Sequence, residues 1–400
     1  MKIAFKHLVS FFNQHPSIGE VSDKLFQLGH EHEIINNKIF DLELTPNRGD
    51  CFSVLGLARD LGSFYEFNDN LPLYKESIDE LQIEFENKSE ALCPKISFLE
   101  IEIEKIPEEY DEDLSLYFRD LGINRNNFFT DISNYISYEM GQPTHCFDRS
   151  KVNKKLVFEE KECDEDFSTL LDSKIKLQGR NGVFLLDKDI ISLAGIMGGK
   201  STSCTPKTKQ VLVECAFFEP ELVIGKSIKY NLNSDSAHKF ERGVDPSIQE
   251  KVLRRFIKLV SDHAKINKLR MISYGSNEQT RIIEKDFDKI NSVLGTNFTE
   301  GKIKETLEKI GFVVGETIQI PHHRHDINSQ NDLAEEVARV VGYDNLPSSQ
   351  IDISSAKLIS EDPSLLSIRE GLLKHGFSEV INFPFVSLEE EFSVSIDNPL

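Results

Sequence analysis

Alternating hydrophobic and polar positions mark the middle of this chain. Four runs between residues 155 and 218 have the length and the content of branched aliphatic and aromatic residues that are typical of β-strands. They are KLVFEE, GVFLLD, DIISLAG and VLVECAFF, at residues 155–160, 182–187, 189–195 and 211–218. Helical patterns lie between these runs, so the stretch predicts a large domain that mixes helices and strands.

The flanking segments predict smaller units. IFDLELT at 39–45 alternates like a strand, and PNRGDCFSVLGLARDLGSFY at 46–65 predicts a turn that leads into a helix. From residue 276 the pattern predicts a strand, a helix capped by Thr299, the strand TIQIP and a second helix, a unit of winged-helix size. From residue 362 a helix runs into a strand near INFPFVS. The fold class is therefore multidomain α+β, with expected divisions at 1–85, 86–275, 276–350 and 351–400.

Acidic residues gather at the start of the helix within HDINSQNDLAEEVARVVGYDNLP, residues 325–347. At about 100° per residue, Asp332, Glu335 and Glu336 share one face, while leucine and valine side chains form an apolar stripe on another. One interpretation is a capping box made by Asp332 and Glu335. The other adds Asp326 from the preceding loop and predicts an all-oxygen site for Mg²⁺ or Ca²⁺.

Glu214 is a carboxylate inside the otherwise apolar run VLVECAFF. Two interpretations stay open: the side chain faces solvent by alternation, or it is buried and accepts a hydrogen bond from a polar ligand. His145 follows a Gly-Gln-Pro turn, and a pocket shared with Ser133 and Asn134 is one hypothesis for it, a structural histidine the other.

Two further segments carry residues suited to a binding site. AGIMGGKS at 194–201 differs from a phosphate-binding loop at its first position and lacks a following helix, so Gly195 and Gly198 predict a close-approach turn instead. SDSAHKFERGVDP at 234–246 adds the hydroxyls of Ser234 and Ser236 in a segment that looks too charged for a core.

The composition limits which partners and which cellular compartment we expect for this protein. With 46 Lys+Arg and 67 Asp+Glu, the formal charge of −21 repels polyanions, so contact with nucleic acid is expected from local basic faces or from another subunit. The six cysteines contain no CxxC pair, which indicates free thiols in a reducing compartment. No apolar run is long enough to span a bilayer and no signal peptide is evident, so we expect a cytoplasmic protein with no membrane partner.

Four stretches in this order resemble the β subunit of bacterial phenylalanyl-tRNA synthetase. They are LELTPNRGDCFSVLGLARDL, DISNYISYEMGQPTHCFD, VLVECAFFEPELVIGKSIKYNLNSDSAHKFERGVDP and HDINSQNDLAEEVARVVGYDNLP. The resemblance implies an (αβ)₂ heterotetramer in which a catalytic α subunit attaches phenylalanine to tRNA(Phe) using ATP. It also implies an editing domain at 86–275 that hydrolyses mischarged tyrosyl-tRNA(Phe), and the start of an inactive class II synthetase-like domain at 351–400.

The resemblance assigns roles residue by residue. It implies a Mg²⁺ site shared with the α subunit at Asp326, Asp332, Glu335 and Glu336. Glu214 matches the carboxylate that recognises the tyrosine hydroxyl, and His145 matches a pocket histidine near the tRNA 3′ end. The remaining positions that match the editing pocket are Ser133, Asn134, Gly195, Gly198, Ser234 and Ser236.

The chain also departs from the family pattern. LGHEHEIINNKIFDLELTPNR leaves no room for the oligonucleotide-binding domain that family members insert there, and we do not expect residues 1–400 to contain the family's C-terminal anticodon-binding domain. Ser236 adds a hydroxyl where the family pattern has alanine. We therefore keep two alternatives beside the ligase subunit: a free-standing editing hydrolase, and a non-catalytic scaffold for the α subunit.

Overall fold

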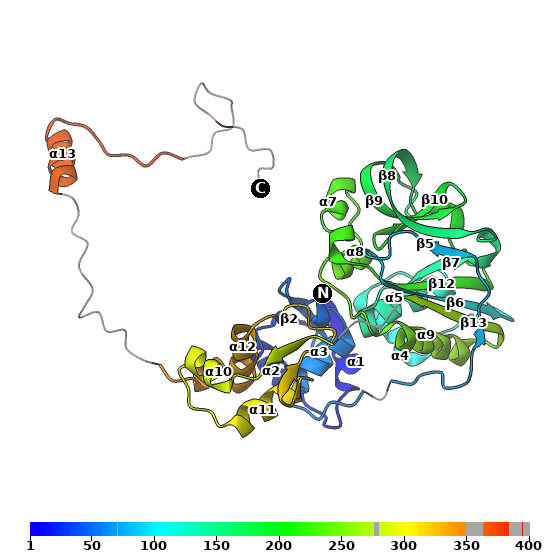
Figure 1. Cartoon of the computed structure of the whole chain (residues 1–400), viewed down its shortest axis with the longest axis horizontal. Coiled ribbons are helices and arrows are strands. Elements are labelled where there is room, and N and C mark those ends of the chain that lie inside the picture. Colours follow the sequence, from blue (N-terminus) through cyan, green and yellow to red (C-terminus); the bar gives the residue numbers. More distant parts are fainter. Residues whose placement is uncertain (70, 276–279, 349–362, 384–393, 395–400) are drawn as a thin grey trace. The chain divides into compact units, whose positions relative to one another are not determined.

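The computed structural model describes residues 1–69, 71–275, 280–348, 363–383 and 394. The chain divides into two compact units, Met1–Pro347 and Ser348–Leu400, and each is described by itself (Figure 1). In the second unit, helix α13 spans Pro363–Lys374 as predicted. Of the strand predicted after it, residues 380–383 are not in a strand, and residues 384–387 lie outside the described residues.

The first residues form a small α/β layer. Strands β1 (Lys2–Ala4), β3 (Ile39–Glu43) and β2 (Glu31–Ile35) make an antiparallel sheet in that order. Helices α1 (Phe5–Val9), α2 (Ile18–Gln27) and α3 (Val54–Leu61) accompany it. The strand and helix predicted in this region are confirmed. Helix α3 is capped by Ser53, whose hydroxyl accepts a hydrogen bond from the Gly56 amide.

Two five-stranded sheets form the central domain (Figure 1). The first has the order β4 (Asp79–Glu80), β13 (Ile266–Gly275), β6 (Lys95–Ile103), β12 (Gln210–Phe217) and β7 (His145–Asp148). The second has the order β11 (Met197–Gly198), β10 (Asp189–Leu193), β9 (Lys174–Leu186), β8 (Leu156–Ser168) and β5 (Phe85–Asn87). The four predicted strand runs fall on β8, β9, β10 and β12. Strands β4 and β5 begin within the range expected for the N-terminal unit, so this range also supplies edge strands to the central sheets.

Strand β12 separates two hydrophobic cores. Val211, Val213 and Cys215 point into a core shared with helices and with the N-terminal layer, whereas Leu212 and Ala216 point into the core between the two sheets. This is the period-two alternation of a strand that is buried on both faces. The N-terminal layer and the central domain consequently share one core, instead of each having a core of its own.

Helices pack on both sheets. Helices α5 (Phe128–Met140) and α9 (Gln249–His263) pack on the first sheet, and α4 (Glu112–Leu121) contacts β1. Helices α6 (Pro220–Val223) and α7 (Lys226–Tyr230) pack on β9, and α8 (Asp235–Phe240) follows them. Short 3-10 helices lie at Gly49–Cys51, Arg149–Lys151, Lys200–Thr202 and Tyr343–Asn345. No described helix has the length and apolarity that crossing a bilayer requires.

The last part of the first unit has its own core. Strands β14 (Ile282–Glu284), β16 (Thr317–Gln319) and β15 (Val313–Val314) form an antiparallel sheet beside helices α10 (Phe287–Leu294), α11 (Glu300–Lys309) and α12 (Gln330–Val341). Thr299 caps α11 by accepting a hydrogen bond from the Lys302 amide, which confirms the predicted cap. Leu333 and Val337 of α12 are fully buried, which confirms the predicted apolar stripe.

The position of Leu212 in the inter-sheet core generates a stability prediction. Leu212 is 0% exposed, so Leu212→Ala removes buried methyl groups and leaves a cavity. We expect a loss of about 2–5 kcal/mol in the free energy of unfolding, measured by urea denaturation. The matched control is Leu171→Ala, because that leucine is 69% exposed and should change stability by less than about 0.5 kcal/mol. Equal effects of the two variants would contradict the described burial.

Candidate functional site

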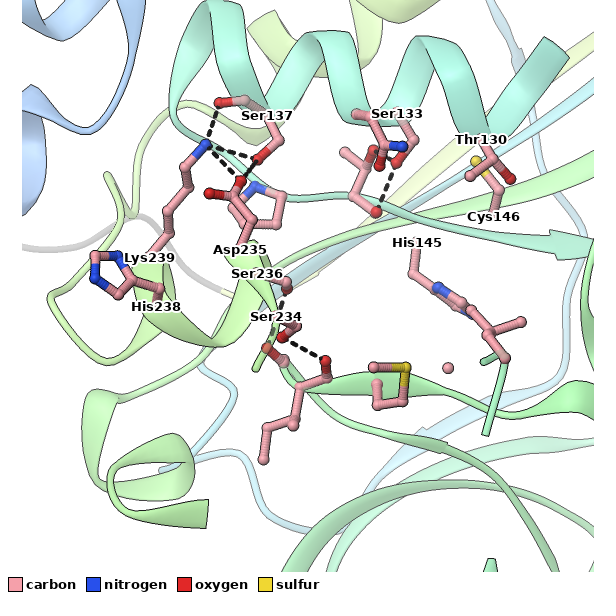
Figure 2. A pocket seen from close by; sticks show the side chains of 18 of the residues that line it. Thr130, Ser133, Ser137, His145, Cys146, Ser234, Asp235, Ser236, His238 and Lys239 are labelled. Atoms are coloured by element: carbon pink, nitrogen blue, oxygen red, sulfur yellow. Dashed lines mark hydrogen bonds and ion pairs between the residues drawn. The ribbon is translucent and has the colours of Figure 1, made fainter. Parts of the chain in front are cut away.

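One cavity collects all eight residues that the sequence assigned to a pocket. It has a volume of about 1050 Å³ and lies among β7, β12, helix α5, the segment that joins β10 to β11, and helix α8 (Figure 2). These eight, among the residues that line it, are Ser133, Asn134, His145, Gly195, Gly198, Glu214, Ser234 and Ser236. Segments that are up to 103 positions apart in the sequence, at 133 and 236, therefore meet at one cavity wall.

Glu214 and His145 are direct neighbours across two strands. Glu214 on β12 pairs with His145 at the start of β7, so their side chains leave the sheet on the same face. Glu214 is only 5% exposed, and the expectation that it faces solvent is wrong. Burial raises the pKa of Glu214 to about 8, which keeps its carboxyl group protonated at neutral pH. Within the described residues, no hydrogen bond to this carboxyl group is recorded.

The ring of His145 packs closely against its neighbours, and its Nε2 atom is unpaired among the described residues. It packs edge-on against Phe147 with ring centroids 4.4 Å apart. A Cβ atom on Gly198 would lie 2.2 Å from Cε1 of the histidine, so only glycine fits there. Burial lowers the pKa of His145 to about 4, and the ring is neutral at physiological pH. Its buried Nε2 has no hydrogen-bond partner in the described structure, which leaves it available to a ligand.

The serine hydroxyls of the cavity are bonded to its walls. Ser133 donates to the Thr144 carbonyl at 2.7 Å, Ser234 to the Ile196 carbonyl at 2.8 Å, and Ser236 to the Gly195 carbonyl at 3.0 Å. Gly195 adopts a left-handed φ of +70°, in agreement with the predicted turn. The hydroxyl that Ser236 adds to the family pattern is thus used to fix this turn. None of the three serines is paired with a histidine as a nucleophile would be.

Sequence reasoning missed a second polar group on the cavity wall, made by Ser137, Asp235 and Lys239. Lys239 was placed in a segment too charged for a core, yet its side chain is only 3% exposed. Its Nζ donates to the Ser137 carbonyl at 2.7 Å and to the Ser137 hydroxyl at 2.8 Å, and lies 3.0 Å from Asp235 Oδ2 (Figure 2). The available signal was the helical spacing of Ser133 and Ser137, which places both on one face of α5.

The four acids near α12 lie outside this cavity, and three of them are bonded to neighbouring groups. Arg324 donates to both oxygens of Asp326 at 2.9 and 2.8 Å and to both oxygens of Glu336 at 2.6 and 2.8 Å. Asp332 accepts from the Ser329 amide at 2.8 Å, so the capping box runs from Ser329 to Asp332 and the expected Asp332–Glu335 pairing is wrong. Glu335 is exposed.

A chain of alternating charges continues from these acids into the N-terminal layer. Arg339 of α12 bonds both to Glu336 and, at 2.7 and 2.8 Å, to the two oxygens of Asp60 on α3. Asp60 also contacts Arg48 at 3.0 Å and His30 at 2.7 Å. These side chains are almost fully buried. A buried charge is unfavourable unless an opposite charge lies beside it. Against the opposing effect of burial, the arginines lower the pKa of Glu336 to about 2 and hold the pKa of Asp60 well below its usual value.

The arginine contacts decide how well the acids fit a metal. A Mg²⁺ ion needs several free carboxylate or water oxygens in near-octahedral geometry. Asp326 and Glu336 are each bound by an arginine through both oxygens, and Asp332 is engaged in capping. As arranged in the described chain, these residues do not fit a preformed magnesium site. The described His30, Cys51 and Asp60 also group closely enough for a metal, but the carboxylate of Asp60 is already shared by two arginines.

The buried charge chain predicts a large effect of removing its central arginine. Arg339→Leu leaves Asp60 and Glu336 buried with one cation fewer, so we expect the free energy of unfolding to fall by roughly 3–5 kcal/mol. Lys304→Ala is the control, because the Lys304–Glu308 pair is about half exposed and 3.7 Å long, and should contribute less than about 0.5 kcal/mol. Urea denaturation of both variants measures the difference. Equal small effects would show that the chain of charges is not formed.

The raised pKa of Glu214 predicts a pH-dependent stability. Between about pH 5 and pH 8 the unfolded chain has this group ionised while the folded chain keeps it protonated, so the contribution of Glu214 to stability falls as pH rises. We expect Glu214→Gln, which cannot ionise, to reduce this fall. The measurement is the urea midpoint of both proteins at the two pH values. An identical pH dependence in the variant would contradict a buried, protonated Glu214.

Comparison with known protein families identifies two regions of the chain. Residues 98–265 match the B3/4 domain, a range that contains strands β7 to β12, most of β6 and the eight cavity residues named above. Residues 283–343 match the tRNA synthetase B5 domain, which contains α12 and its acids. The two matched regions correspond to the central domain and to the last part of the first unit.

Three relatives that are similar over most of this chain are phenylalanine–tRNA ligase β subunits. The phenylalanine–tRNA ligase β subunit of Francisella tularensis is 32% identical, with 92% of this chain and 49% of the relative covered. That of Vibrio parahaemolyticus is 30% identical, covering 88% and 45%, and that of Acinetobacter baylyi is 30% identical, covering 92% and 48%.

Among solved structures, an N-terminal fragment of the phenylalanyl-tRNA synthetase β subunit from Pyrococcus horikoshii aligns with 85% of this chain and 99% of that fragment. Its identity is 16% and its TM-score 0.47. The sequence relatives are roughly twice as long as the region they share with this chain. On the sequence relationship, the chain is similar over about nine tenths of its length to phenylalanine–tRNA ligase β subunits, and it spans about half the length of these curated relatives.

Proposed function

We propose that this chain acts as a β subunit of phenylalanine–tRNA ligase and that its central cavity removes tyrosine wrongly attached to tRNA(Phe). The observation that carries the proposal is Glu214, a buried and protonated carboxyl group that faces a cavity with no recorded partner among the described residues. Burying such a group without a partner is unfavourable. A ligand with its own polar group relieves that cost, which favours a binding role over a purely structural one.

Tyrosine is a suitable ligand on physical grounds. It differs from phenylalanine by one hydroxyl group, and a hydrophobic synthetic site rejects an added hydroxyl by only about 10²-fold. A second site that hydrogen-bonds this hydroxyl would select tyrosine, because phenylalanine would leave Glu214 unpaired. The apolar neighbours that line the same cavity, among them Phe218 and Phe240, suit an aromatic ring.

Hydrolysis in this proposal uses a water molecule and no covalent intermediate. The hydroxyls of Ser133, Ser234 and Ser236 are held by backbone carbonyls, and none is bonded to a base. The neutral His145 has a free Nε2 that would bind the substrate or the attacking water. We assign His145 and Glu214 to the deacylation site, with Asn134 and the glycine turn at 195–198 as parts of its wall.

Synthesis of phenylalanyl-tRNA is proposed to belong to an α subunit that uses ATP and Mg²⁺, with the two subunits in an (αβ)₂ assembly. The charge of −21 argues that this chain does not hold tRNA(Phe) alone, so the partner would supply much of the RNA contact. We assign no step to a metal at Asp326, Asp332, Glu335 and Glu336, because two of these carboxylates are bound by Arg324.

The proposal is tested by deacylation of tyrosyl-tRNA(Phe) by the full chain, with and without the α subunit. We expect Glu214→Ala to lower kcat/KM about tenfold or more, because it removes a buried hydrogen-bond partner of the substrate. Glu162→Ala is the control, since that carboxylate is 73% exposed on β8 and outside the cavity.

The outcomes separate the alternatives. Hydrolysis that depends on the α subunit supports a ligase subunit, and hydrolysis without it supports a free-standing editing enzyme. Absence of hydrolysis in both conditions would overturn the editing role and leave the scaffold for the α subunit. Equal activity of Glu214→Ala and the parent chain would overturn the assigned recognition of the tyrosine hydroxyl.

A further inference from the structure

The group of Ser137, Asp235 and Lys239 is a second polar feature of the cavity, apart from His145 in Figure 2. Ser137 comes from α5, and Asp235 and Lys239 lie one turn apart on α8. The three side chains join the two helices through a lysine that is only 3% exposed. Such a buried cation has to be fully paired, and the contacts show how.

Lys239 has no donor left for a ligand. An ammonium group has three N–H donors, and those of Lys239 are directed to the Ser137 carbonyl, the Ser137 hydroxyl and Asp235 Oδ2. The hydroxyl of Ser137 in turn donates to the same Asp235 oxygen at 3.2 Å. Lys239 and Ser137 therefore fix the orientation of the Asp235 carboxylate from one side.

Asp235 keeps its other oxygen available. The side chain is 69% exposed although it lines the cavity, and no contact of Oδ1 is recorded within the described residues. Partial removal from solvent inside the cavity raises the pKa of Asp235, but the contacts to Lys239 and Ser137 lower it by more, so the group is ionised. Glu214 and Asp235 are the two carboxyl groups that line the cavity, and they differ in charge at neutral pH.

We propose that the free oxygen of Asp235 binds the α-ammonium group of an aminoacyl ester, with Ser137 and Lys239 as positioning residues. The inference rests on the proposed deacylation function and deepens it. An aminoacyl ester presents a cation next to the scissile bond and, in tyrosine, a neutral hydroxyl at the far end of its side chain. A charged carboxylate and a neutral one in the same cavity match these two groups, and the charge-assisted hydrogen bond is the stronger of the two kinds.

The test compares two substrates of the full chain, with the α subunit included if activity needs it. Tyrosyl-tRNA(Phe) carries the ammonium group, and N-acetyl-tyrosyl-tRNA(Phe) lacks it. We expect Asp235→Asn to lower kcat/KM for the first ester by about tenfold or more and to leave kcat/KM for the second unchanged. Lys239→Met should act in the same direction, because it releases the carboxylate that it positions.

Asp187→Asn is the matched control, since it removes one negative charge from an exposed turn outside the cavity. Equal losses on both esters would show that Asp235 only maintains the wall and would overturn the inference, as would equal activity of Asp235→Asn and the parent chain on both. Failure of the parent chain to hydrolyse the free-amine ester would instead overturn the proposed deacylation function. Thermal midpoints of all variants identify any loss that comes from unfolding.

Discussion

The alternation of strand β12 is the constraint on which both cores and the cavity depend. Odd-numbered positions from Val211 to Cys215 face helices α5 and α9, and even-numbered positions face the second sheet. A shift of one residue in its pairing with β6 and β7 would exchange these faces. Glu214 would then point at the helices and lose His145 as its neighbour. The hydrophobic pattern that folds the domain thus also places a carboxyl group where a ligand can reach it.

Buried carboxyl groups of this chain are ionised in one place and protonated in another. Glu336 and Asp60 are buried beside arginines, so they stay ionised and join α12 to α3. Glu214 is buried among apolar groups without a cation, so it takes up a proton. The same residue type therefore acts as a fixed anion in one place and as a neutral donor or acceptor in the other. Its chemistry is decided by the neighbours, which the sequence supplies from distant segments.

These distant neighbours mark the limit of prediction from sequence. The strands at 155–218 follow from local pattern, because hydrophobic and polar residues alternate along the chain, whereas the same alternation left the burial of Glu214 undecided. The eight cavity residues came from a family resemblance and meet in one place. The partner of Asp60 on helix α12 could not be foreseen in the same way. Arg339 meets Asp60 across 279 positions, and no local spacing encodes that contact.

The cavity and the buried charges are connected through one segment. After α8, which carries the Asp235 and Lys239 wall, the chain reaches Val244, whose carbonyl is 2.8 Å from the Nε2 of His325. The His325 ring stacks on Phe217 at the end of β12, with centroids 6.2 Å apart. His325 lies between Arg324 and Asp326. The loop that carries Arg324 therefore also contacts the chain at Val244, just after helix α8. The packing of α12 on α3 and the position of the cavity wall therefore share the same supporting contacts.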